Sequence, residues 1–202
     1  MDPLSPERRD CLQSATALVV AAGVSVSVRA AGGPTAPTPG PTMTGPSPRQ
    51  RTPGKPGDFD FLSGHWKIHN LRLLDDGRWD EFEGEASCFG ILGGVCSVEE
   101  LRIPARKFSG MGLRLLDLKQ QLWVDHWVSG KSGVVTLPGM NGSFEGGAGL
   151  FEADDEENGK PVKYRGVWDQ VSARGCRWQQ ASSRDGGRSW ALNWSMLWTR
   201  AG

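Results

Sequence analysis

The chain has 202 residues, enough for one ordinary domain with appended segments. Lysine and arginine together number 23, as do aspartate and glutamate, so the formal net charge is zero. A balanced charge gives no support to nucleic acid or an anionic membrane surface as a partner. The 28 glycines, set between short apolar runs, suit the turns of an all-β fold better than helices.

The first thirty residues have the three parts of a secretory signal peptide. A polar start ends in Arg8-Arg9, residues 11–28 are uncharged and mostly small or apolar, and Val28-Arg29-Ala30 offers a cleavage site. The paired arginines resemble a twin-arginine (Tat) signal, although Cys11 stands where a bulky residue is usual. We therefore expect export by the Tat translocon to a bacterial periplasm or the extracellular space, with no stable membrane span after cleavage. The alternative is an uncleaved N-terminal anchor.

Residues 31–57 form a segment of different composition. They hold eight of the thirteen prolines, with glycine, threonine and serine between them. Such a segment cannot bury a core, so it is predicted to be a disordered linker. The folded domain is then expected to span residues 58–202.

From Asp58 onward, apolar residues recur with a period of two and show no sustained helical period. The predicted strands span residues 64–74, 78–89, 95–103, 109–118, 121–129, 144–153, 160–171, 175–183 and 189–200. The connections are short, which favours antiparallel neighbours over parallel pairs. The pattern predicts an all-β, antiparallel, up-and-down β-barrel of about eight to ten strands.

The entry to the first strand reads D-F-D-F-L-S-G-H-W over residues 58–66. A glycine two residues before a tryptophan lets the backbone pass close to the indole. This opening resembles the calycin superfamily of lipocalin-like barrels and, within it, a bacterial family of uncharacterised lipocalin-like proteins. The resemblance covers about residues 58–200. It implies a structural role for Gly64, for Trp66 as the plug at one end of the barrel, and for Arg200 packed over that indole.

Residues 183–190 fit the pattern S-x-D-x-G-x-x-W, which is similar to the Asp-box of sialidase-like propellers. In such a turn Asp185 bonds the backbone amides, Gly187 takes a positive φ, and Trp190 packs beneath. A propeller needs blades repeated at a fixed period, and the motif occurs here once. We interpret it as a structural hairpin between the last two strands.

The three histidines give two open interpretations. His65 and His69 lie about 13 Å apart on a regular strand, too far to share a metal ion, so no metal site is expected. His126 follows Asp125 in an otherwise apolar strand. If it projects inward, it is a candidate acid or base paired with Asp125, or a haem ligand as in nitrobindin-like calycins. If it projects outward, its role is structural.

The cysteines leave another question open. Cys88 and Cys96 flank a predicted turn symmetrically, so a cross-strand disulfide between them is geometrically feasible and an oxidising periplasm permits it. A longer loop would shift the register and remove that pairing. Cys176 is interpreted as a small buried hydrophobe.

All nine tryptophans fall within the predicted barrel, where large flat residues suit the lining of an apolar pocket. The favoured function is non-catalytic binding of a small, largely apolar or aromatic molecule inside the barrel, without a cofactor. One alternative is a calycin-type isomerase or hydrolase using His126 and Asp125; another is a surface module that binds sugars or proteins. The candidate lining residues are Trp66, Phe82, Met111, His126, Trp127, Trp168 and Trp194.

Overall fold

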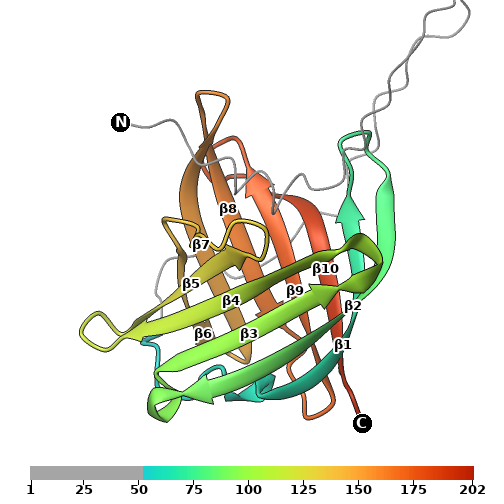
Figure 1. Cartoon of the computed structure of the whole chain (residues 1–202). Coiled ribbons are helices and arrows are strands. Elements are labelled where there is room, and N and C mark those ends of the chain that lie inside the picture. The colour runs from blue at the N-terminus through green and yellow to red at the C-terminus, as the bar shows by residue number, and fades with distance from the viewer. Residues whose placement is uncertain (1–51) are drawn as a thin grey trace, which may run out of the picture.

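The structure is a computed structural model that describes residues 52–202; the expected signal peptide and most of the linker lie outside them. The described part forms one closed antiparallel barrel (Figure 1). Its strands are β1 (Gly64–Leu73), β2 (Trp79–Ile91), β3 (Cys96–Ile103), β4 (Phe108–Asp117), β5 (Leu122–Ser129), β6 (Met140–Glu145), β7 (Ala148–Glu157), β8 (Lys160–Asp169), β9 (Gly175–Ser183) and β10 (Ala191–Arg200). Each strand pairs with the next, and β10 returns to β1. The predicted all-β, up-and-down barrel is confirmed.

Strand β6 was not predicted, because its sequence reads as a glycine-rich loop. Its Gly142 lies opposite Phe151 on β7, and a Cβ built on this glycine would fall 2.6 Å from the phenyl ring. The glycine therefore serves close packing between strands rather than a turn. The predicted strand at 144–153 joins the end of β6 to the start of β7, which Gly146 and Gly147 separate with positive φ.

One end of the barrel is plugged by the 3₁₀ turn η1 (Asp60–Leu62) and the indole of Trp66. Trp66 Nε1 donates a hydrogen bond of 2.6 Å to the Leu62 carbonyl, and the Arg200 guanidinium lies 4.2 Å above the indole ring. Arg200 also donates to the carbonyls of Phe61 and Ser63. A side chain at Gly64 would collide with the guanidinium, so the glycine leaves room for it.

The folded part begins before Asp58. The Gly54 amide donates to the Gln121 carbonyl at 2.8 Å, and the Gly57 amide donates to the Gly94 carbonyl at 2.9 Å. Gly54 is buried against the indole of Trp123, where a Cβ would come within 2.8 Å of the ring. The last residues of the predicted linker segment are thus joined to the barrel by two backbone amides, which proline-rich composition does not reveal.

The hairpin between β9 and β10 has the Asp-box form. Asp185 Oδ1 accepts hydrogen bonds of 2.9 Å from the amides of Arg188 and Ser189, and Gly187 has a φ of 92°. Trp190 is buried beneath the turn, and a guanidinium from β8 (Arg165) lies 3.9 Å over its ring. The turn is a structural device that fixes the register of the last two strands.

Among the described residues Cys88, Cys96 and Cys176 are all free and buried. The 3₁₀ turn η2 (Leu92–Gly94) lengthens the connection between β2 and β3, so Cys88 pairs with Glu99 and Cys96 pairs with Ile91. The two cysteines do not face each other, and the disulfide considered from the sequence does not form.

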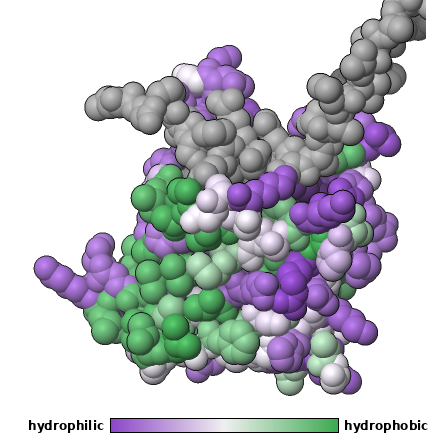
Figure 2. Space-filling model, in the orientation of Figure 1, coloured by the Kyte–Doolittle hydropathy of each residue, from purple (hydrophilic) through white to green (hydrophobic). Residues whose placement is uncertain are grey.

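The outer surface carries an apolar area near the β2–β3 and β4–β5 turns (Figure 2). Its exposed side chains include Phe89, Leu92, Leu115 and Leu118. No helix within residues 52–202 is long and apolar enough to cross a membrane.

Candidate functional site

The side chains of β5 alternate between the two faces of the barrel. Trp123, Asp125 and Trp127 face the lumen, and on β4 the paired residues that face it are Arg114, opposite Asp125, and Gly112, opposite Trp127. They border a lumen cavity of about 100 Å³. Its lining residues are Glu99, Leu101, Gly112, Arg114, Asp125, His126, Trp127, Met140, Trp168, Trp178, Gln180, Trp194, Met196 and Trp198.

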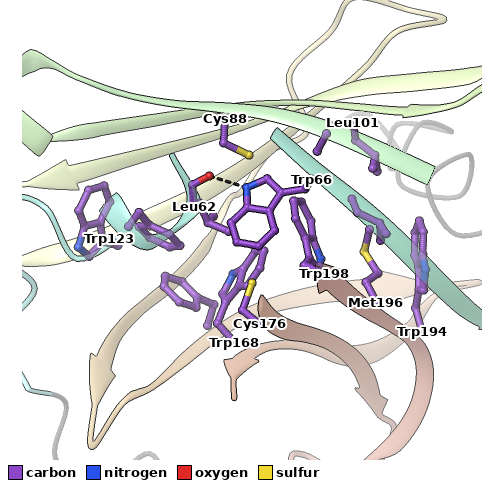
Figure 3. Close-up of a cluster of buried hydrophobic side chains, with 14 of the residues drawn as sticks. Leu62, Trp66, Cys88, Leu101, Trp123, Trp168, Cys176, Trp194, Met196 and Trp198 are labelled. Atoms are coloured by element: carbon purple, nitrogen blue, oxygen red, sulfur yellow. Dashed lines mark hydrogen bonds between the residues drawn. The ribbon is translucent and has the colours of Figure 1, made fainter. Parts of the chain in front are cut away.

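One wall of the cavity is aromatic and comes from β8, β9 and β10. Trp168 and Trp198 have ring centroids 5.4 Å apart at 61°, and Trp178 and Trp194 have centroids 5.9 Å apart at 80°. Figure 3 shows Trp168, Trp198 and Trp194 with Met196 inside the barrel. Edge-to-face pairs of this kind fix the rings in place, so the wall is rigid and apolar.

The opposite wall carries three charged side chains on adjacent strands, which we call the charged cluster: Glu99 on β3, Arg114 on β4 and Asp125 on β5. Arg114 Nη2 donates to Glu99 Oε2, and Arg114 Nε lies 3.6 Å from Asp125 Oδ1. The side chains of Arg114 and Glu99 are only 4% exposed. Removing such charges from water costs several kcal/mol per ion, which makes the cluster a candidate for function rather than for stability.

The protonation of the charged cluster follows from its burial. Burial raises the pKa of Asp125 to about 6, with Glu99 adding to the rise and Arg114 and His126 opposing it. Burial also disfavours the charge on Arg114, but the carboxylates of Glu99 and Asp125 outweigh it and hold its pKa above the usual value. The guanidinium therefore stays charged while Asp125 titrates near neutral pH.

Several polar hydrogen atoms of the side chains that line the cavity have no acceptor. Arg114 Nε and Nη1, and the indole nitrogens of Trp127, Trp168 and Trp198, are buried without a hydrogen-bond partner among the described residues. Other buried indoles are satisfied: Trp194 donates to Asn70 Oδ1 at 3.1 Å. Unpaired buried donors are rare in native proteins and call for an explanation.

His126 lies at the seam between β5 and β6, where pairing between the two strands stops at Asp125. Its Nδ1 is 3.4 Å from the Thr136 carbonyl oxygen, and a Cβ on Gly139 would fall 2.7 Å from the ring. The imidazole therefore packs against the loop of residues 130–139, and His126 is also among the residues that line the cavity. The carboxylate of Asp125 turns to Arg114 rather than to this histidine.

The other residues expected from the sequence have different positions. Trp127, Trp168 and Trp194 line the cavity, whereas Trp66 forms the plug. Phe82 lies on the inner face but borders a smaller cavity of about 20 Å³, under the guanidinium of Arg106.

Met111 pairs with exposed Glu100 and points away from the lumen, so the structure does not bring it to the site. The prediction placed Met111 in the lumen because the sequence does not show which side chains of β4 face inward.

The sequence interpretation did not include the charged cluster beyond Asp125. Glu99 and Arg114 sit in phase with buried apolar residues of their strands, such as Leu101 and Leu116. A charged residue at the same alternation as buried apolar residues can be recognised in a sequence. On β4, however, the sequence does not show which residues face inward, because the neighbouring inward positions are glycines, Gly110 and Gly112.

The closed barrel is consistent with a calycin-like fold. No protein-family model matches the chain, and the comparison with curated proteins finds no match. Among solved structures, the chain is similar to the crystal structure of Rv2717c from M. tuberculosis, at 11% sequence identity and a TM-score of 0.46. That similarity covers 71% of this chain and 95% of the mycobacterial one.

Proposed function

We propose that this chain is an exported, lipocalin-like binding protein that holds one small, largely apolar molecule inside its barrel. The observation that carries the proposal is the cavity of about 100 Å³ with a rigid tryptophan wall. Drug-sized ligands occupy pockets of roughly 300–1,000 Å³, whereas an apolar cavity of about 150 Å³ binds benzene. The ligand is therefore a compound with a single ring or of similar size. Export and the periplasmic location rest on the N-terminal sequence.

The geometry favours binding over catalysis by His126 and Asp125. The imidazole contacts a loop carbonyl at the barrel seam, and the carboxylate belongs to the charged cluster. The pair therefore lacks the base–orienter contact that acid–base chemistry uses. A haem macrocycle is several times larger than the cavity, and the His126 imidazole contacts the Thr136 carbonyl, so these residues do not fit that group.

A surface module that stacks sugars on tryptophans is also less favoured. Of the nine tryptophans, all within residues 52–202, Trp79 alone is exposed. Sugar-binding platforms need indole faces open to solvent. The large aromatic surface of this protein is directed inward instead.

The proposal is tested by titrating the purified protein with fluorobenzene and following the ligand by ¹⁹F NMR. We expect saturable binding of one molecule per barrel. Leu101→Phe fills the cavity that Leu101 lines and should weaken binding by at least about tenfold. Leu197→Phe, on the exposed face of β10, is the matched control and should bind as the wild type does. Absence of saturable binding, or equal binding by both variants, would refute a lumen site.

A further inference from the structure

We propose that the lumen selects a neutral single-ring carbonyl compound, whose oxygen accepts a hydrogen bond from the guanidinium of Arg114. This inference rests on the proposed function, because it names the ligand class of the same cavity. Three features of the lumen carry it: the unpaired donors, the fixed position of Arg114, and the sign of the local charge.

The unpaired donors indicate one group that the ligand can offer. The buried nitrogens without partners among the described residues are all hydrogen-bond donors: Arg114 Nε and Nη1, and the indole N–H groups of Trp127, Trp168 and Trp198. All four side chains line the cavity. The indoles of Trp66, Trp123 and Trp190 lie outside that lining and each donate to a protein oxygen. A ligand that pairs with these nitrogens must therefore supply an acceptor, which a pure hydrocarbon lacks.

Arg114 is the donor held most firmly in place. Its Nη2 is bonded to Glu99, its Nε faces Asp125, and its Cζ lies 5.1 Å from the ring centroid of Phe59 and 5.2 Å from that of Trp168. These contacts fix the plane of the guanidinium and leave Nη1 as its unused end. A charged donor held in position before binding forms a strong hydrogen bond at little entropic cost.

The charge balance decides between a neutral acceptor and an anion. At pH 8 the ionised Asp125, whose pKa is about 6, and Glu99 supply two negative charges against the one positive charge of Arg114. An anionic ligand would add a further negative charge to a buried site that already has an excess. A carbonyl oxygen supplies the acceptor without the charge, so we assign the ligand to the neutral class.

The test compares three probes of nearly the same size and shape at pH 8: acetophenone, α-methylstyrene and benzoate. Acetophenone should bind about tenfold more tightly than α-methylstyrene, which replaces the carbonyl oxygen by a methylene group. Benzoate should bind more weakly than either. The infrared band of ¹³C-labelled acetophenone carbonyl should shift to lower frequency on binding to the wild type, as it does when a carbonyl accepts a hydrogen bond.

Variants assign the interaction to Arg114. Glu99→Leu/Arg114→Met removes the donor together with one carboxylate and adds no new donor, so it should bind both neutral probes equally and abolish the infrared shift. Arg106→Met is the matched control, because Arg106 lies over Phe82 at the smaller cavity. This variant should keep the preference for acetophenone and the infrared shift. If the double variant does not fold, the infrared band of acetophenone bound to the wild type still shows whether the carbonyl accepts a hydrogen bond.

The outcomes separate this inference from the function on which it rests. Equal binding of acetophenone and α-methylstyrene, or an unshifted carbonyl band, would overturn the carbonyl assignment and leave the lumen-binding function intact. Tightest binding by benzoate would overturn the neutral class in favour of an anion. Failure of all three probes, together with fluorobenzene, would overturn the proposed function itself.

Discussion

Three charged residues inside the barrel, Glu99, Arg114 and Asp125, set the polarity of the lumen. They are held on neighbouring strands by the register of β3, β4 and β5. A hydrophobic trio of the same volume would often be as stable or more so. The charges are therefore weak evidence for stability, and what they supply is a fixed, positively charged donor facing an aromatic wall.

Asp125 gives this cluster a testable dependence on pH. Its pKa is raised by burial from 3.8 to about 6, so the native state holds its proton more tightly than the unfolded chain. The corresponding stability is fully present below about pH 4 and is lost as the pH rises through about 6, by ~3 kcal/mol. Urea unfolding of wild type and Asp125→Asn between pH 4 and 8 measures the difference, and the variant should lack this fall.

Asp75→Asn provides the control, because this aspartate lies exposed in the β1–β2 turn. Its stability profile should follow that of the wild type. Parallel profiles for the wild type and Asp125→Asn would contradict the raised pKa of the buried carboxyl group.

At the scale of single elements, two contacts hold the ends of the sheet. The plug joins η1, β1 and β10 through Arg200, and the Asp-box turn joins β9 to β10 through Asp185. The contact of Arg200 with Trp66 was expected from the resemblance to calycins, and the turn was expected from its local motif. The strand β6 was missed because glycines hide the alternation there. The backbone bonds of Gly54 and Gly57 to the barrel were not foreseen, because backbone bonds leave no mark in composition.

Removal of the Arg200 guanidinium should loosen the plugged end. Arg200→Met loses the cation–π contact with Trp66 and the bonds to the Phe61 and Ser63 carbonyls, so we expect destabilisation of ~2–4 kcal/mol in urea unfolding. Arg78→Met removes only an exposed ion pair with Asp76 and should cost much less. Similar costs for the two variants would contradict the role of Arg200 in closing the barrel.

The Asp-box turn should respond to both mutation and acid. Hydrogen bonds from Ser189, joined by those from Ser183 and Arg188, hold the pKa of Asp185 well below its usual range, so these bonds are present at neutral pH and weaken as the pH falls below the normal carboxyl range. Asp185→Ala should speed amide hydrogen exchange at Arg188 and Ser189 at least about tenfold, and Asp185→Asn, which keeps one acceptor, should do so less. Unchanged exchange in Asp185→Ala would show that the turn does not depend on the carboxylate.

At the scale of the whole molecule, the alternation of the strands specified the closed barrel but not which side of each strand faces inward. On β5 the sequence allows either phase, since Trp123 and Trp127 occupy one face and Val124 and Val128 the other. The closed sheet shows which face of β5 points inward, because Trp123 is fully buried and Arg114 lies opposite Asp125. Trp127, Trp168 and Trp194 were among the predicted lining residues, but Trp178 and Trp198 were not. The charged cluster depends on contacts among three strands.

The most direct test of the central claim is the native mass of the full chain purified from its own source, compared with its mass after denaturation. We predict that the native mass exceeds the denatured mass by one neutral, single-ring compound, while Leu101→Phe shows no such excess. Equal native and denatured masses for the wild type, unchanged after soaking in acetophenone, would contradict a ligand-holding lumen.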